Sequence, residues 1–161
     1  IDTSRMGVHE LRELVHQRLE QRSQSRLTVT FESFGFKYGI PGDADFVFDA
    51  RSIPNPYWEP TLRKLTGRDP EVVKFLEAQE AAGRLIEDIA RFIDSRVPEY
   101  HASNRGYLTV AVGCTGGQHR SVYIVDRLVE RFGSRFANVT ARHSALPATQ
   151  LFHPKIVAAN N

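Results

Sequence analysis

The feature that most constrains this chain is the segment from residue 107 to residue 123, which reads Y-L-T-V-A-V-G-C-T-G-G-Q-H-R-S-V-Y. Its apolar run suits a buried strand and ends at Gly113, a loop with Gly116 and Gly117 follows, and an amphipathic segment begins near Gln118. The segment therefore predicts a strand, a glycine loop and a helix. Such a loop gathers backbone N–H groups and the positive end of a helix dipole, which favours a bound phosphate, sulfate or carboxylate.

Three side chains of this loop bear on anion binding. Arg120 has the strongest case, because a guanidinium recognises an anion in a bidentate manner that lysine cannot reproduce. His119 is either a second ligand of the anion or a solvent-facing residue at the start of the helix, and we favour the ligand. Cys114 is either a small apolar side chain at a strand end, the commoner role, or a reactive thiol. The candidate ligand-binding residues of the loop are Cys114, Thr115, Gly116, Gly117, Gln118, His119, Arg120 and Ser121.

The rest of the chain alternates predicted strands with predicted helices. Strands are expected at residues 27–31, 46–48 and 136–140, besides the central one. A helix is expected to begin at Asp69 and Pro70, to break near Gly83 and to end at Pro98, and the helix after the loop is expected to stop at Gly133. This order, preceded by helical spacing in residues 3–19, predicts one α/β layered domain with a mostly parallel sheet and an N-terminal helix.

The loops that follow the strands of a parallel sheet meet at one edge, where ligands usually bind. Residues 33–43 and 53–60 are too rich in glycine and proline for regular structure and are expected to form two of these loops. We therefore expect Lys37, Arg51 and Tyr57 to lie near the glycine loop. The neighbouring aromatic pair, Tyr57 and Trp58, either closes a pocket or packs at an interface.

Composition limits the class of protein. The chain has 161 residues, of which 41% are hydrophobic and 25% are charged, as in an ordinary globular domain. It contains no run of about 18 apolar residues and no apolar core of a signal peptide, and its single cysteine cannot form an internal disulfide. We expect a cytoplasmic protein without a membrane-spanning segment.

The net charge of +2 hides an asymmetry, since the residues after position 100 are clearly basic and the first 100 carry a net negative charge. Polyanions are therefore possible partners of the second half, although such a charge is more often a solvated surface. The candidate nucleic-acid contacts are Arg127, Arg131, Arg135 and Arg142.

The spacing of Cys114, Arg120 and Ser121 is that of cysteine-dependent phosphatases, in which a thiolate attacks phosphorus while the arginine holds the phosphate oxygens. That chemistry needs a carboxylic acid as proton donor, for which Asp43, Asp45 and Asp49 are candidates. Gly113, however, replaces the histidine that usually precedes the nucleophile. The loop lacks the lysine of a nucleotide-binding P-loop, and no cysteine or histidine spacing indicates a metal site.

Several segments, taken together and in this order, resemble the C-terminal domain of the RapZ and YvcJ family. They are S-F-G-F-K-Y-G-I-P at residues 33–41, D-A-D-F-V-F-D-A-R at residues 43–51, N-P-Y-W-E-P at residues 55–60, L-R-K-L-T-G at residues 62–67 and, above all, the segment at residues 107–123. The opening I-D-T-S-R-M-G-V-H-E-L is similar to the junction at which the family's P-loop kinase-like N-terminal domain ends.

The resemblance implies a fold like one half of phosphofructokinase, with the glycine loop as a sensing pocket for glucosamine-6-phosphate. It also implies self-association and, in enterobacterial members, binding of small regulatory RNAs that are presented to an endoribonuclease. Full-length relatives bind and slowly hydrolyse ATP or GTP through the N-terminal P-loop domain. The positions that match the family's pocket are Lys37, Arg51, Cys114, Thr115, Gly116, His119 and Arg120.

Two departures from the enterobacterial pattern concern specificity and RNA. Tyr57 stands where those members have histidine, and only Lys155 follows Arg142 where they have a dense basic cluster. Because phosphate contacts dominate RNA affinity, the lack of that cluster weakens the case for RNA binding.

We therefore expect three regions: a linker helix at residues 1–26, an α/β ligand-sensing domain at residues 27–143 and a poorly structured tail at residues 144–161. The expected function is regulatory and non-enzymatic, without a cofactor, with a small phosphorylated ligand and with RNA, an endoribonuclease and a second copy of the chain as partners. The alternative is a cysteine-dependent phosphatase-like enzyme that uses Cys114, Arg120 and Asp49.

Overall fold

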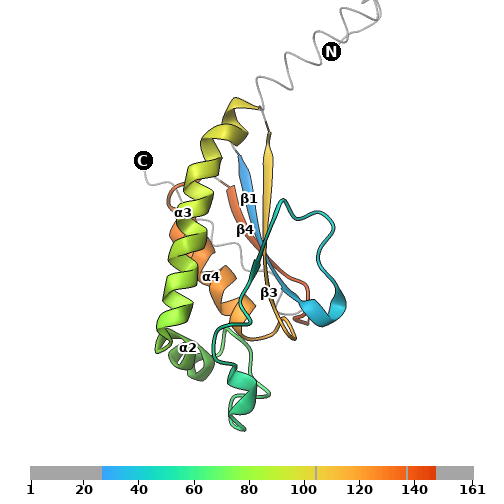
Figure 1. Ribbon diagram of the computed structural model, residues 1–161, viewed down its shortest axis with the longest axis vertical. Coiled ribbons are helices and arrows are strands. Elements are labelled where there is room, and N and C mark those ends of the chain that lie inside the picture. Colours follow the sequence, from blue (N-terminus) through green and yellow to red (C-terminus); the bar gives the residue numbers. More distant parts are fainter. Residues whose placement is uncertain (1–26, 104, 137, 148–161) are drawn as a thin grey trace, which may run out of the picture.

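Four parallel strands form the centre of the structure. The computed structural model describes residues 27–103, 105–136 and 138–147, and Figure 1 shows one sheet with the helices on one side of it. The strands are β1 (Thr28–Gly35), β2 (Phe46–Asp49), β3 (Tyr107–Cys114) and β4 (Asn138–His143), in the spatial order β2-β3-β1-β4. Every pairing is parallel. The predicted α/β domain with a parallel sheet is confirmed.

The helices cover one face of this sheet. They are α2 (Pro70–Glu77), α3 (Glu80–Ala102) and α4 (Arg120–Gly133), and two short 3-10 helices, η1 (Phe36–Tyr38) and η2 (Pro56–Trp58), lie in the loops after β1 and β2. Figure 1 shows the chain between β1 and β2 on the opposite side of the sheet from the helices. Loops from both sides therefore reach the carboxyl ends of the strands.

The hydrophobic core lies between the sheet and the helices, because alternate residues of each strand point toward them. Leu108, Val110 and Val112 of β3 have no exposed surface, and Phe31 of β1 stacks on Phe132 of α4 with ring centroids 5.5 Å apart. Burial of each such side chain contributes about 1.5–3 kcal/mol. This packing fixes the ends of β1 and β3, from which the candidate site is built.

Two predicted element boundaries differ from the structure because pairing and capping outweigh local composition. β1 continues to Gly35, beyond the predicted end at residue 31, since it pairs with β3 as far as Gly35 opposite Cys114. The helix break lies at residues 78–79 and not near Gly83, because the side chain of Gln79 donates to the carbonyl of Phe75 at the end of α2 (3.1 Å). Gly83 falls in the first turn of α3.

The ends of α3 and β4 also differ from the prediction. Pro98 lies inside α3, which continues to Ala102, so the missing N–H of one proline does not end a helix of 23 residues. β4 runs from Asn138 to His143 and not from residue 136 to residue 140, because it pairs with β1 in that register. The strand therefore includes Arg142 and His143.

Packing continues beyond His143. The N–H and hydroxyl of Ser144 both donate to the carbonyl of Ser33 (3.0 Å each), and Leu146 is 6% exposed. The predicted linker helix at residues 1–26 and most of the predicted tail lie outside the described residues. Among the helices that the structure describes, none is both long and apolar enough to span a membrane.

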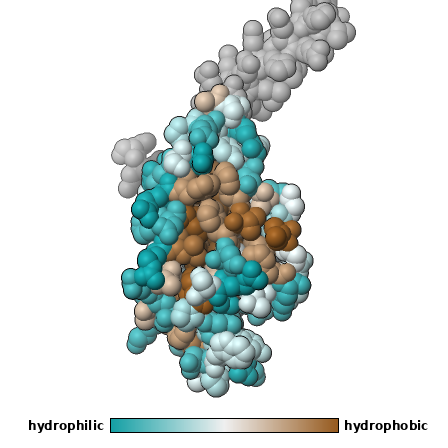
Figure 2. All heavy atoms as spheres, viewed as in Figure 1, coloured by the Kyte–Doolittle hydropathy of each residue, from teal (hydrophilic) through white to brown (hydrophobic). Residues whose placement is uncertain are grey.

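One edge of the sheet is apolar at the surface. β2 is the outer strand there, and Figure 2 shows apolar side chains gathered beside α3 on this side of the molecule. Val47 of β2 is 41% exposed, and Ile40, in the loop before it, is 59% exposed.

Candidate functional site

The glycine loop follows β3 at the carboxyl edge of the sheet and leads into α4 at Arg120. Gly117 has a φ of +73°, and a Cβ there would lie 2.6 Å from the nitrogen of Gly35. A Cβ on Gly35 would in turn lie 2.7 Å from the carbonyl carbon of Gly116. The loop is thus pressed against the end of β1, backbone to backbone, and only glycine permits this approach.

Cys114 is held inside this loop. Its Sγ is 3.3 Å from the nitrogen of Gly117, which donates to it, and 3.2 Å from the hydroxyl of Ser121. Burial alone raises the pKa of the thiol, but the hydrogen bonds from Ser121 and Gly117 and the nearby charge of Arg120 together lower this pKa below its ordinary value. The residue is only 2% exposed, so its sulfur is shielded from solvent.

Arg120 is buried at the start of α4. Its Nη1 donates to the carbonyls of Arg51 (3.1 Å) and Ile53 (2.9 Å), and its Nη2 donates to the hydroxyl of Thr115 (3.3 Å). Its Nε has no hydrogen-bond partner among the described residues. Arg120 thus ties the segment after β2 to the glycine loop, and its Nε remains available to a ligand.

A cavity of about 600 Å³ opens beside Arg120, and we call it the Arg120 cavity. Its chemistry is mixed, since it combines the guanidinium groups of Arg51 and Arg120 with the ring of Trp58 and the carboxylate of Glu59. Within the described part of the chain, Glu59 forms no ion pair. The lining residues are Arg51, Ile53, Pro54, Asn55, Trp58, Glu59, Phe75, Thr115 and Arg120.

Arg51 is the exposed cation of this cavity. It forms a bidentate ion pair with Asp49 (2.7 Å at its closest) and lies over the ring of Phe36, 4.1 Å from the centroid. The bond to Asp49 raises the pKa of Arg51 and lowers that of Asp49. Asp49 is therefore held as a carboxylate.

Two predicted pocket residues lie beside the Arg120 cavity without lining it. Tyr57 packs against Arg63, whose guanidinium is 4.8 Å from its ring centroid, so Trp58 and not Tyr57 faces the cavity. Lys37 lies over the ring of Tyr38 (4.6 Å) with its Nζ near Gly116, and its N–H donates to the carbonyl of Thr115 (3.3 Å). Lys37 is therefore close to the loop but does not line the cavity.

His119 is not solvent-facing, since it is only 6% exposed. Burial lowers the pKa of its imidazole, and the carbonyls of Leu62 and Leu65, which face the ring, oppose this shift. Nε2 has no hydrogen-bond partner among the described residues. The ring packs against the segment that contains Leu62 and Leu65. A direct contact between His119 and a ligand stays a prediction.

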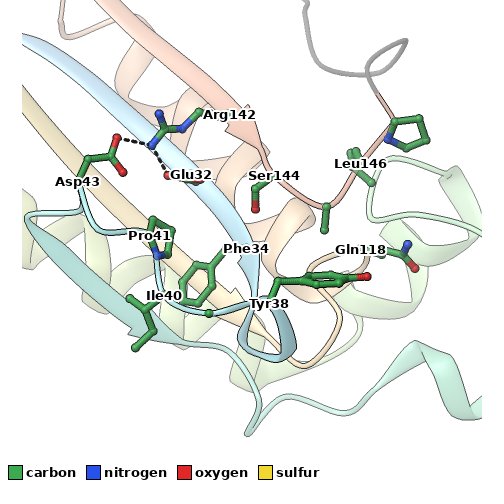
Figure 3. A pocket seen from close by; sticks show the side chains of 13 residues that line it. Glu32, Phe34, Tyr38, Ile40, Pro41, Asp43, Gln118, Arg142, Ser144 and Leu146 are labelled. Atoms are coloured by element: carbon green, nitrogen blue, oxygen red, sulfur yellow. Dashed lines mark hydrogen bonds and ion pairs between the residues drawn. The ribbon is translucent and has the colours of Figure 1, made fainter.

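A second cavity, of about 750 Å³, lies on the other side of the loop, and we call it the Tyr38 cavity (Figure 3). Arg142 forms ion pairs with Glu32 and with Asp43 (2.7 Å) at one end of it. Figure 3 shows Tyr38 and Gln118 at the other end. The only cation that lines this cavity is thus already paired with carboxylates, whereas Arg120 in the other cavity bonds neutral oxygen atoms.

The three aspartates considered as proton donors are all bound elsewhere. Asp49 pairs with Arg51, and the bond from Arg142 lowers the pKa of Asp43. Asp45 accepts from Arg105 (2.7 Å) and from the nitrogen of Thr109 (2.9 Å). In this arrangement none of them offers a proton at Cys114.

The arginines of α4 beyond Arg120, and Arg135 just after this helix, also have partners. Arg127 pairs with Glu77 (3.2 Å) and Glu130 (2.8 Å), and Arg135 pairs with Asp94 of α3 (2.8 Å). Arg131 pairs with Glu87 of α3. Arg127 thus joins α4 to α2, and Arg131 joins it to α3. No group of side chains suited to a metal ion occurs among the described residues.

Sequence reasoning missed Phe75 and Glu59 in the Arg120 cavity and the buried contacts of His143. Phe75 reaches the cavity from α2, and nothing in its helical spacing distinguishes it from a core residue. His143 escaped notice because β4 was expected to end before it. If the predicted strand is extended by three residues, its alternation places the ring of His143 on the buried face of the sheet.

Comparison with known proteins agrees with this fold and loop. Residues 27–147 match the family model described as the RapZ C-terminal domain. The chain is 53% identical over 146 residues to a nucleotide-binding protein of Chromohalobacter salexigens (91% of this chain, 49% of the relative) and 53% identical over 149 residues to one of Dechloromonas aromatica (92% and 53%). It is 49% identical over 146 residues to the RNase adapter protein RapZ of Yersinia pseudotuberculosis (91% and 51%).

The chain spans about half the length of these relatives. The family model covers most of the chain, including both cavities and the loop between them. The chain therefore belongs to the RapZ family and corresponds to its C-terminal domain.

Proposed function

We propose that this domain binds a small phosphorylated ligand between the glycine loop and the segment after β2. The observation that supports this most strongly is Arg120, a buried residue that lines a cavity and whose Nε has no partner among the described residues. A buried donor without a partner is costly, and an anion bound there offsets that cost. The dipole of α4, which starts at this residue, favours the same charge.

The opposite wall of the cavity indicates the rest of the ligand. Trp58 offers an aromatic face on which a sugar ring can stack, and Glu59 offers a carboxylate without a cation partner among the described residues. Two guanidinium groups and one free carboxylate in one cavity suit a ligand with an anionic group and an amine. An amino sugar phosphate such as glucosamine-6-phosphate has both, which agrees with the sequence-based prediction.

Calorimetry with glucosamine-6-phosphate tests this proposal. Arg120→Lys keeps the charge but loses the forked donor, so we expect its affinity to fall about tenfold or more. Arg84→Ala changes an exposed arginine of α3 that does not line the cavity, so this control should bind like the wild type. Equal heats from wild type and Arg120→Lys, or none from the wild type, would sink the proposal.

The same calorimeter tests the amine contact. Glu59→Gln should weaken glucosamine-6-phosphate and leave glucose-6-phosphate unchanged, because only the first ligand carries an ammonium group. If both ligands lose affinity equally, Glu59 does not read the amine.

A second candidate function is a cysteine-dependent phosphatase. Its support is the lowered pKa of the Cys114 thiol and the hydroxyl of Ser121 beside it. The three aspartates bound elsewhere count against it. Turnover of an aryl phosphate that disappears in Cys114→Ser would establish this activity, and an inert wild type would remove it.

The regulatory partners are a further part of the proposal. The relative named an RNase adapter suggests an RNase or an RNA as partner, and the candidate RNA surface is the row of Arg127, Arg131 and Arg135, with Arg142 on the opposite face of the sheet. Because carboxylates already pair with these cations, RNA binding should be weak and strongly salt-dependent. A salt titration with a small RNA decides this, and negligible affinity at low salt rules it out for this chain alone.

Self-association is proposed at the apolar sheet edge. β2 pairs with β3 on one edge, no described strand pairs with its other edge, and Val47 is exposed on it. Exposed apolar edges favour strand pairing between copies. Sedimentation of wild type and Val47→Lys should show a larger species only for the wild type. A larger species that persists in the variant would place the interface elsewhere.

A further inference from the structure

The segment at residues 62–69, which we call the backing segment, packs against the residues that join the glycine loop to α4. It lines neither of the two cavities. The ring of His119 faces carbonyls of this segment, and the N–H of Gly67 donates to the carbonyl of Gln118 (2.8 Å). The backing segment contains the L-R-K-L-T-G motif at residues 62–67, so this motif supports the loop from behind the anion site.

Gly67 lies directly against the first turn of α4. A Cβ on it would lie 2.2 Å from the carbonyl oxygen of His119, 2.6 Å from the nitrogen of Tyr123 and 2.9 Å from the Cβ of Val122. The first two atoms belong to one hydrogen bond at the start of α4, in which the N–H of Tyr123 donates to the carbonyl of His119 (3.0 Å). Gly67 does not have a positive φ, so only this close contact requires glycine.

Two sets of bonds hold Gly67 in this place. Oδ2 of Asp69 accepts from the N–H (2.6 Å) and from the hydroxyl (2.9 Å) of Thr66, which closes a turn around Gly67. Arg68 forms two bonds to the carboxylate of Asp126 on α4 (2.8 and 3.2 Å). The backing segment is therefore attached to α4 beyond its first turn, and a movement of Gly67 away from the helix would strain these bonds.

We propose that Gly67 is a positioning residue for the anion site, because its lack of a side chain lets the backing segment fix the first turn of α4. Arg120 is the first residue of this helix, so its place depends on that contact. A side chain at position 67 would displace the helix start and, with it, the Nε that has no partner among the described residues. The effect on anion binding rests on the proposed function, whereas the position of Arg120 in the free protein does not.

A general loss of stability would have a different effect on binding. It lowers the fraction of folded protein but leaves the affinity of the folded molecules unchanged. A displaced Arg120 lowers the affinity of the folded protein itself. A variant that is destabilised elsewhere in the core separates the two cases. Ile93 of α3 is suited to this purpose, because it has no exposed surface and lines neither cavity.

Calorimetry with sulfate, at a temperature at which each variant is folded, tests the proposal. Gly67→Ala should bind sulfate about tenfold more weakly than the wild type, the loss expected when one charge-assisted hydrogen bond is misplaced. Gly83→Ala is the matched control and should keep wild-type affinity, because a Cβ on Gly83 meets nothing within 4 Å. Ile93→Ala should also keep it. Wild-type affinity in Gly67→Ala, or an equal loss in Ile93→Ala, overturns the proposal.

Nitrogen NMR of the arginine side chains gives a second readout that needs no ligand. The Nε–H signal of Arg120 is identified as the one that is absent in Arg120→Lys. It should move in Gly67→Ala and stay in place in Gly83→Ala and Ile93→Ala. An unmoved signal in Gly67→Ala overturns the proposal. If the wild type binds no sulfate while the signal moves as expected, the proposed function fails and the positioning role of Gly67 stands.

Asp69→Ala provides the same test if Gly67→Ala does not fold. It removes the acceptor of both bonds from Thr66 without adding bulk, and the side chain of Asp69 makes no capping bond to α2. Sulfate affinity should fall about threefold, and the Nε–H signal of Arg120 should move. Loss of a negative charge alone would strengthen anion binding, so weaker binding reports a change of position. Unchanged or tighter binding with an unmoved signal overturns the proposal.

Discussion

Arg120 and Arg131 lie on the same helix, α4, but differ in burial and in their bonding partners. Arg120 is 4% exposed, bonds only neutral oxygen atoms and has an Nε without a partner among the described residues. Arg131, three turns further along, has a side chain that is 37% exposed and pairs with the carboxylate of Glu87. The two guanidinium groups carry the same charge, but among the described residues only Arg120 lacks an ion-pair partner and has an Nε without a hydrogen bond.

The two cavities repeat this contrast. In the Tyr38 cavity, Arg142 is neutralised by Glu32 and Asp43, whereas in the Arg120 cavity Arg120 bonds two carbonyls and a hydroxyl and forms no ion pair with a described residue. The affinity of a site for an anion depends on cationic groups whose charge is still uncompensated, and less on the count of basic residues. The basic second half of the chain is for this reason a poor guide to where an anion binds.

The largest expected effect is that of Arg120→Ala. It should abolish detectable binding of glucosamine-6-phosphate and lower the free energy of unfolding by about 3 kcal/mol, because the buried carbonyls of Arg51 and Ile53 lose a charged donor. Urea unfolding and calorimetry measure the two effects. A variant that is as stable as the wild type would show that Arg120 does not hold the segment after β2.

A smaller loss is expected from Gly117→Ala. The new Cβ requires a positive φ and meets the backbone of Gly35, so the free energy of unfolding should fall by about 2–3 kcal/mol. Gly116→Ala is the matched control in the same loop, because its Cβ meets nothing closer than the Cε of Lys37 at 3.9 Å. Its effect should stay within about 0.5 kcal/mol. Equal losses in both variants would mean that the loop is not pressed against β1.

The sequence was sufficient to predict the parallel sheet, the glycine loop and the position of Arg120 at its end. These features depend on apolar runs, glycine and chain order, all of which are local. The directions of single side chains were not predictable in this way. Tyr57 and Trp58 are neighbours with similar chemistry, yet Tyr57 packs against Arg63 and Trp58 lines the cavity.

Boundaries and buried polar contacts escaped prediction for a related reason. The end of β1 is set by its pairing with β3, and the break between α2 and α3 by one side-chain bond from Gln79. The buried His143 bonds Ser33, which lies 110 residues earlier in the chain, so no local pattern reveals this contact. Contacts of this kind are settled by tertiary structure, which a single sequence encodes only indirectly.

A smaller change in the free energy of unfolding is expected from Cys114→Ser, and its sign follows from the pKa of the thiol. The folded state lowers this pKa from its ordinary value of 9.0, chiefly because bonds from Ser121 and Gly117 outweigh the effect of burial. The thiolate therefore adds stability that is fully present above the unfolded pKa and is lost as the pH falls through the folded pKa. The difference in unfolding free energy between wild type and Cys114→Ser should rise with pH up to about pH 9. A difference that does not change with pH would show that the thiol is not perturbed.

The smallest effect is expected from Arg131→Ala, which removes the paired arginine that was compared with Arg120. Its ion pair with Glu87 is exposed, so its loss should change the free energy of unfolding by less than about 0.5 kcal/mol. Binding of glucosamine-6-phosphate should not change, because the pair lies on the α3 side of α4 and not at its start. Glu87→Ala is the matched control, since it frees Arg131 without removing it. The opposite outcome is that Glu87→Ala strengthens ligand binding while Arg131→Ala weakens it. In that case the paired cations of α4 contribute to the anion site. Long-range charge would then explain ligand affinity better than the Nε donor of Arg120 does.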